Sequence, residues 1–381
     1  MKHSILKGME NILGASKINT YLDKIEDSLY IEDTFGRQII LGTYPNFKPE
    51  AFISGIPISI KGKLDDKGIF LFDDYLFYEN ININIKNDFI FNSPPTKESN
   101  NNKDGKLILF ISNLKIGFPQ DEIGFNESLR TLLIEFIQNR NNINNEFKNY
   151  SDKISRIILL GSSLNTGENE LEKKMIYDNS SCSSMDNNIL ENYISLNNFL
   201  NILSNYTYVD LMPSSDSNDD IFYPQKPLNK ILFSENIKNI NCSTLNLVSN
   251  PYFFQIQNNN KYKNFVGTSG ENIKIIKQYS YYNNNIEIMK KNLEWKHFCP
   301  MNPHNLNLYS PDNKSDPLLI QEIPDVYFTS SDEINFKYEK VYMDNKQIIL
   351  MSLPDFSKSA KCVLFNYEYN TYKIIEFKFN I

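Results

Sequence analysis

Short apolar runs separated by polar turns make up the first part of the chain. The runs have the length and the β-branched or aromatic content of strands, and they lie at 29–31, 38–41, 52–60 and 69–72. Glycine-containing turns such as Gly36-Arg37 lie between them. Short strands at this spacing are typical of a small antiparallel barrel or sandwich, and an oligonucleotide-binding (OB) type barrel is the natural candidate.

A polar stretch at 92–106 follows, with Pro94-Pro95 and the asparagines Asn100 to Asn102. This composition is typical of a linker. It divides the chain into a weakly patterned segment at 1–27, a barrel domain at 28–91, the linker at 92–106 and a second domain at 107–381.

The pattern changes beyond the linker. A continuous apolar run at 107–111 and mostly apolar runs at 154–160, 208–212 and 245–248 alternate with amphipathic helical patterns at 127–140 and 190–203. Runs of this kind predict strands that are buried on both faces and separated by helices. Shorter strand-like runs come later, at 326–328, 347–352 and 372–379. The order predicts a mixed α+β chain whose second domain is a two-sheet β-sandwich flanked by helices.

Charge and composition narrow the possible functions. Lys and Arg number 39 against 46 Asp and Glu, a net charge of −7, which is the wrong sign for a protein that grips a nucleic-acid backbone. The four cysteines are widely spaced and form no zinc or redox motif. No apolar run has the length of a signal peptide or a membrane span, so we expect a soluble, intracellular protein.

Ordered motifs in the carboxy-terminal half carry a resemblance to a known family. They are Leu247 to Tyr252, Gly267 to Ile273, His297 to Pro303, Asp316-Pro317, Pro324 to Phe328 and Leu353 to Phe356. Together they resemble the small (second, or B) subunits of eukaryotic DNA polymerase delta. Met212-Pro213, Pro224 to Leu228, and Tyr30 to Asp33 with Gly36-Arg37 fit the same family. The resemblance spans about residues 28 to 381 and rests on the order of the motifs.

The resemblance implies a fold with two parts. One is an OB-type barrel, here incomplete because the family's first barrel strands precede the Tyr30 motif. The other is a calcineurin-like phosphoesterase domain that has lost its metals in eukaryotes. Carried onto this chain, the family's metal-ligand motifs fall on 112–117, on 161–165, near 213–217, at about Val266 and near 330–333. The degenerate ligand positions are then Asn113, Lys115, Ser162, Asn165 and Ser331.

These residue types do not suit a metal. A pair of divalent ions needs carboxylate and imidazole ligands, and a lysine ammonium repels a cation. We therefore expect no cofactor, no metal and no catalytic residue. We expect His297 to make structural hydrogen bonds, and Gly267 to Gly270 to form a tight turn before a helix at 272–278.

The function implied by the resemblance is that of a non-catalytic scaffold. Such a subunit holds the carboxy-terminal cysteine-rich domain of the polymerase delta catalytic subunit, bridges to a third, elongated subunit, meets DNA mainly through the complex, contacts no membrane and is located in the nucleus. The alternatives are a B subunit of polymerase alpha or epsilon, a residual metal-dependent phosphoesterase or nuclease, and a free single-strand-binding module. The Gly267 to Gly270 and His297 to Pro303 motifs favour delta.

Overall fold

The computed structural model describes residues 28–42, 51–77, 106–117, 123–138, 148–164, 182–214, 222–233, 244–258, 261–301, 316, 318–343 and 345–378. The strands are β1 (Tyr30–Glu32), β2 (Gln38–Gly42), β3 (Ile58–Leu64), β4 (Phe70–Phe77), β5 (Leu107–Ser112), β6 (Ile154–Leu160), β7 (Tyr208–Leu211), β8 (Leu245–Leu247), β9 (Tyr252–Asn258), β10 (Lys261–Thr268), β11 (Val326–Ser330), β12 (Lys337–Met343), β13 (Lys346–Leu353), β14 (Lys361–Asn366) and β15 (Thr371–Glu376). The helices are α2 (Ile123–Ile137), α3 (Lys148–Ser151), α5 (Cys182–Ser204), η3 (Lys230–Phe233), α7 (Glu271–Tyr279), α8 (Asn285–Trp295) and α9 (Phe356–Ser359).

The chain divides into two compact units. Unit 1 contains residues 1–87, 272–306 and 313–323, and unit 2 contains residues 88–271, 307–312 and 324–381. Unit 1 therefore joins the amino-terminal strands to a later part of the chain that includes α8.

The strands of unit 1 form a four-stranded sheet in the order β1-β2-β4-β3. Among the described residues this sheet is open and does not close into a barrel. The predicted strand at 52–60 is partly wrong, because the strand begins only at Ile58. Gly55 has φ +89°, a left-handed conformation that ends extended structure, and Pro57 has no N–H to donate to a neighbouring strand.

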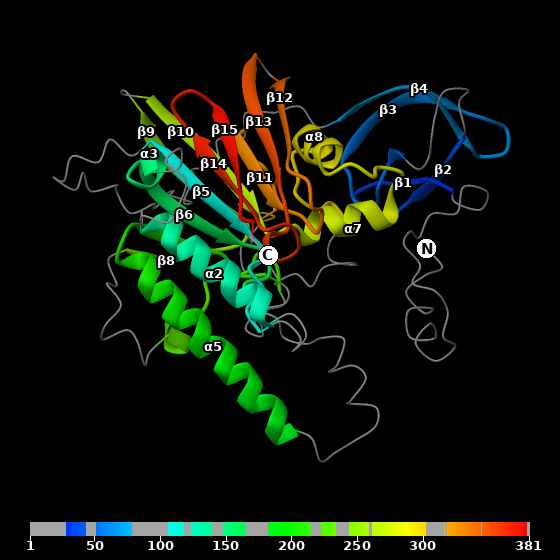
Figure 1. Ribbon diagram of the computed structural model, residues 1–381. Coiled ribbons are helices and arrows are strands. Elements are labelled where there is room, and N and C mark those ends of the chain that lie inside the picture. The colour runs from blue at the N-terminus through cyan, green and yellow to red at the C-terminus, as the bar shows by residue number, and fades with distance from the viewer. Residues whose placement is uncertain are drawn as a thin grey trace. The chain divides into compact units, whose positions relative to one another are not determined.

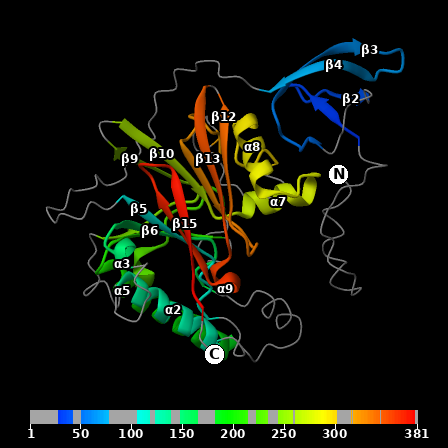
Figure 2. The ribbon, with the colours of Figure 1, turned by 45° about the horizontal axis from the view of Figure 1, so that its top comes forward.

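Unit 2 contains two sheets. The six-stranded sheet has the order β15-β14-β5-β6-β7-β8, and the five-stranded sheet has the order β12-β13-β11-β10-β9. Strands β5 to β8 run parallel, while β14 and β15 are antiparallel at one side. Figures 1 and 2 show α2 and α5 along one face of the six-stranded sheet, with the five-stranded sheet on its other face. The mixed α+β class and the helix-flanked pair of sheets agree with the sequence prediction.

The alternation along β5 explains why its sequence is continuously apolar. Leu107, Leu109 and Ile111 point into the core beneath α2 and α5, whereas Ile108 and Phe110 point into the core between the two sheets. All six residues of β5 are buried. A strand covered on both faces has no polar side, so its apolar run shows no period of two. No helix in the described part of the chain is long and apolar enough to cross a membrane.

Candidate functional site

The loop after β5 contains the first predicted ligand positions. Asn113 and Lys115 both have left-handed backbones, with φ of 56° and 46°. The N–H of Asn113 donates to the carbonyl of Leu160 at 2.9 Å, and the N–H of Lys115 donates to the carbonyl of Ser162 at 3.0 Å. The loop therefore continues the β5–β6 pairing past the carboxyl ends of both strands.

The Asn113 side chain is buried and fully committed to hydrogen bonds. Its Oδ1 accepts the N–H of Ser162 at 2.9 Å and the hydroxyl of Ser330 at 3.2 Å. Its Nδ2 donates to the carbonyl of Ser331 at 3.0 Å. Gly161 is required beside it, because a Cβ at Gly161 would collide with Asn113 Oδ1 and the Ser330 hydroxyl. The structure thus bonds the Asn113 side chain to backbone groups of Ser162 and Ser331, in a network that ties strand ends to one another.

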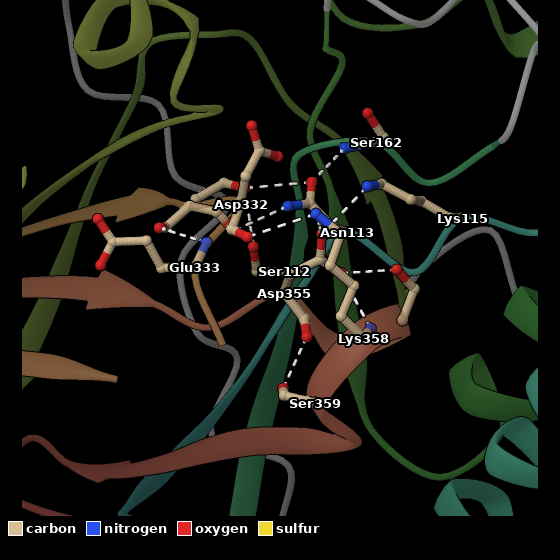
Figure 3. Close-up of polar contacts among 12 residues, drawn as sticks. Ser112, Asn113, Lys115, Ser162, Asp332, Glu333, Asp355, Lys358 and Ser359 are labelled. Atoms are coloured by element: carbon tan, nitrogen blue, oxygen red, sulfur yellow. Dashed lines mark hydrogen bonds and ion pairs between the residues drawn. The ribbon is translucent and has the colours of Figure 1, made fainter. Parts of the chain in front are cut away.

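Lys115 meets a carboxylate that the sequence reasoning did not assign to the site. Its ammonium lies 3.0 Å from Asp355 Oδ2, and the Lys358 ammonium lies 3.5 Å from the same oxygen (Figure 3). Asp355 is completely buried, and its Oδ1 accepts the Ser357 hydroxyl at 2.6 Å and caps α9 through the N–H of Lys358. An Asp that follows a buried strand by two residues and precedes a short helix is a recognisable helix-capping pattern, which is the feature that could have drawn attention to it.

The remaining predicted positions are dispersed. Val266 lies within β10, where it pairs with Tyr327, and not at a strand end. The Ser331 hydroxyl accepts the N–H of Glu333 at 3.0 Å. Asn165 and the 215–217 part of the third motif lie outside the described residues. In the part of the chain that the structure describes, no group of three or more His, Cys, Asp or Glu side chains is placed to share a metal ion.

A small cavity of about 10 Å³ lies beside Gly161 and is lined by Ser163, Ser214 and apolar side chains from α5. The Ser163 hydroxyl is buried and has no hydrogen-bond partner among the described residues. A space of this size has room for roughly one water molecule, whereas a ligand pocket occupies about 300–1,000 Å³. This cavity suits a bridging water and not a nucleotide.

A second buried polar network joins three motifs of the resemblance. Asn250 Nδ2 donates to the hydroxyl of Tyr223 at 2.9 Å, to Gln225 Oε1 at 2.7 Å and to the hydroxyl of Ser269. The Tyr223 hydroxyl donates to Glu271 Oε2 at 2.7 Å. Burial and the neighbouring Glu271 raise the pKa of Tyr223 well above its usual value, so its hydroxyl keeps its proton. The tight turn predicted at 267–270 is shorter than expected, because Gly267 and Thr268 belong to β10 and only Ser269 and Gly270 connect it to α7.

A buried ion pair joins the neighbouring strands β6 and β7 of the six-stranded sheet. Arg156 Nη1 lies 2.6 Å from Asp210 Oδ2, which also accepts the Tyr252 hydroxyl at 3.0 Å. Asn246 donates to the other carboxylate oxygen at 2.9 Å. Burial is the largest single influence on the pKa of Arg156 and lowers it, but Asp210 and Tyr252 together outweigh burial and the pKa is raised. The sequence reasoning missed this pair, because its two residues interrupt apolar runs without any motif.

His297 makes structural hydrogen bonds, as predicted. Its Nδ1 accepts the N–H of Cys299 at 3.0 Å, so Nε2 carries the proton and donates to Asp316 Oδ2 at 3.0 Å. This hydrogen bond lowers the pKa of Asp316, and the N–H of Leu318 adds to the effect. Burial raises the pKa of the Cys299 thiol to about 12. His297 therefore ties together backbone segments of unit 1.

A comparison with known protein families identifies the family of this chain. The model of the family described as the B subunits of DNA polymerases alpha and epsilon matches residues 108–337, more than half of the chain. The chain belongs to this family.

Its similarity to individual proteins points to one branch of the family. The DNA polymerase delta small subunit of Oryza sativa subsp. japonica is 28% identical, over 90% of this chain and 72% of the relative. The proteins of the same name from Arabidopsis thaliana and Saccharomyces cerevisiae are 25% and 26% identical, over 90% and 92% of this chain and 70% of each relative.

Proposed function

We propose that the chain is an accessory subunit of DNA polymerase delta and acts in DNA replication and repair synthesis in the nucleus. The observation that carries this proposal is the similarity to delta small subunits from plants and yeast over about nine-tenths of the chain. The geometry at 112–117 is compatible with a non-catalytic role, because the Asn113 amide and the Lys115 ammonium are both engaged by protein groups.

We propose further that the two units correspond to the two parts of the family. The open sheet of unit 1 would belong to an OB-type barrel, and the paired sheets of unit 2 would form the phosphoesterase-like domain. Asn113, Lys115, Ser162 and Ser331 would then stand at former ligand positions. The hydrogen bonds from the Asn113 side chain to backbone groups of Ser162 and Ser331, at adjacent strand ends, support the assignment.

The proposed partners are the carboxy-terminal cysteine-rich domain of the catalytic subunit and a third, elongated subunit. Large side chains at the surface of both units offer anchors for such contacts: Tyr30 and Leu76 in unit 1, and Tyr342 and Tyr369 in unit 2. Exposed aromatic side chains of this kind are enriched among residues that dominate protein interfaces.

Co-expression of the full chain with the polymerase delta catalytic subunit of the same organism tests the proposal. We expect a stable stoichiometric complex on size-exclusion chromatography. The catalytic subunits of polymerases alpha and epsilon, expressed in parallel, test the alternative that membership of the family leaves open. Preferential binding to either of them would reject the delta assignment.

Residual phosphoesterase activity is the second candidate, and its motivation is the resemblance to a family whose fold includes a phosphoesterase-like domain. Hydrolysis of a phosphodiester substrate in the presence of Mn²⁺, measured with the purified full chain, addresses it. We expect no turnover above that of the same reaction without protein. Metal-dependent turnover that follows the protein through purification would contradict the non-catalytic assignment.

A further inference from the structure

The side chains at the first ligand motif do not fit a divalent ion. A metal ligand must offer a free lone pair, and an ammonium has none. The Lys115 ammonium instead lies against the buried Asp355 carboxylate, and both polar atoms of the Asn113 amide are already bonded within the protein.

We propose that the Lys115 ammonium is a built-in cation that serves as the counter-charge of this site in place of a bound metal ion. Its ion pair with Asp355 acts as a lock between segments that are distant in the chain. The ion pair joins the loop after β5 to the segment that leads from β13 into α9, and both segments also hydrogen-bond to the segment after β11. Figure 3 shows these side chains converging from separate elements.

Backbone contacts place the three segments side by side. Ser112 forms a parallel bridge with Asp355, and the Ser112 hydroxyl lies 2.7 Å from the Ser330 hydroxyl. The N–H of Asp355 donates to the carbonyl of Glu333 at 2.9 Å, and the N–H of Ser357 donates to the carbonyl of Asn113 at 3.2 Å. The carboxylate therefore sits where strand ends of both sheets meet.

Burial decides whether Lys115 or Lys358 stabilises the Asp355 carboxylate more strongly. Asp355 has no exposed side-chain surface, and a buried carboxylate without a counter-charge is strongly unfavourable. The Lys115 side chain is 19% exposed and lies 3.0 Å from the carboxylate, whereas Lys358 is 44% exposed and lies at 3.5 Å. Water screens the exposed pair more strongly. Lys115 therefore supplies most of the compensating charge.

Two variants of the full chain separate the lysines. Lys115→Met keeps much of the aliphatic side chain and removes the charge, and Lys358→Met is the matched control at the same carboxylate. We expect the melting temperature to fall by roughly 5–10 °C for Lys115→Met and by less than about 2 °C for Lys358→Met. Equal shifts in the two variants would overturn the proposal.

A double variant keeps the test decisive if Lys115→Met does not fold. Lys115→Met combined with Asp355→Asn removes both charges, and an Asn oxygen can still accept the hydrogen bonds of Ser357 and Lys358. We expect the double variant to recover at least about half of the lost melting temperature, or to restore folded protein. A double variant no better than Lys115→Met would show that charge compensation is not the role of Lys115.

Metal addition provides a separate readout on the wild-type chain. Because the counter-charge is built in, we expect EDTA and millimolar MnCl₂ to leave the melting temperature unchanged. A ligand that binds the folded state raises the melting temperature by mass action. A rise with MnCl₂ that is lost in Asp355→Asn would mean that the site still holds a metal, and the proposal would fail. The test needs no polymerase subunit, so its result is independent of the proposed function.

Discussion

The sheet of unit 1 and the sheets of unit 2 are stabilised differently. In unit 2 every residue of β5 is buried, and Arg156 and Asp210 form an ion pair inside the structure. In the described residues between 28 and 77, Ile53 and Phe72 are the only buried apolar side chains, while Tyr30 and Leu76 are more than half exposed. Unit 2 therefore builds its own core, and the small sheet depends on a few contacts with later parts of unit 1.

Removing the buried arginine should have the largest effect in unit 2. Arg156→Met leaves Asp210 uncompensated inside the sheet, with only the hydroxyl of Tyr252 and the amide of Asn246 as partners. We expect a loss of about 4 kcal/mol in the free energy of unfolding, measured by urea denaturation. Lys337→Met, which breaks the partly exposed pair with Glu333, is the control and should cost less than about 1 kcal/mol. A cost below that of the control would show that Asp210 does not need the arginine.

In unit 1 we expect the largest effect at Gly55, which packs against the turn at Pro300. A Cβ at Gly55 would collide with the Pro300 carbonyl, and the φ of +89° already disfavours any other residue. We expect Gly55→Ala to destabilise unit 1 by about 3 kcal/mol, visible as faster hydrogen exchange in peptides from 51–77. Peptides from β5 should be unchanged.

Gly36 provides the matched control for this steric effect. It has φ +79°, yet a Cβ there would meet no atom within 4 Å. Gly36→Ala introduces the backbone strain without a steric collision, so we expect it to lower the free energy of unfolding by about 1 kcal/mol. If the two alanine variants cost the same, the packing against Pro300 contributes nothing and the small sheet does not depend on it.

The sequence predicted unit 2 better than unit 1 for a physical reason. The run at 107–111 is continuously apolar because β5 is covered on both faces, and Arg156 is the one charged residue in the mostly apolar run at 154–160. Strand-length apolar runs separated by helical patterns indicate strands of one sheet. The strand expected at 52–60 began only at Ile58, because a glycine turn packed on Pro300 occupies its first half. That contact joins residues far apart in the chain, so local patterns could not reveal it.

Contacts between residues far apart in the chain also limited what the sequence could predict about the site. The structure bonds Asn113 to backbone groups of Ser162 and Ser331, and the assignment of these residues to former ligand positions stays a prediction. Asp355 was recognised as part of a motif but not as the partner of Lys115, because the two are 240 residues apart. Helix α8 was missed as well, although Asn284 caps its first turn, because its polar residues lie between closely spaced apolar ones.

The buried network around Asn250 should be less costly to disturb than the Arg156 pair, since its members are mostly neutral. Asn250→Ala removes donors to Tyr223 and Gln225, and it leaves the Gln225 oxygen without this bond. We expect a loss of about 2 kcal/mol in unit 2, measured by urea denaturation. Asn246→Ala, which removes one partly buried hydrogen bond to Asp210, should cost about half as much. The reverse order would mean that the three motifs do not depend on the network.

The smallest expected effect is a dependence on pH in unit 1. The hydrogen bond from His297 lowers the pKa of Asp316 below its usual value, so this group stabilises the fold above the unfolded pKa of about 4 and loses that contribution as pH falls through the folded value. Part of the Asp316 side chain is exposed, which limits the effect.

We expect Asp316→Asn to be less stable than wild type at pH 6 and to approach it near pH 3, measured by denaturant unfolding at each pH. Carboxylates elsewhere titrate alike in both proteins and cancel in the difference. A gap between the two proteins that stays constant across this range would show that Asp316 acts through its hydrogen-bond geometry and not through its charge.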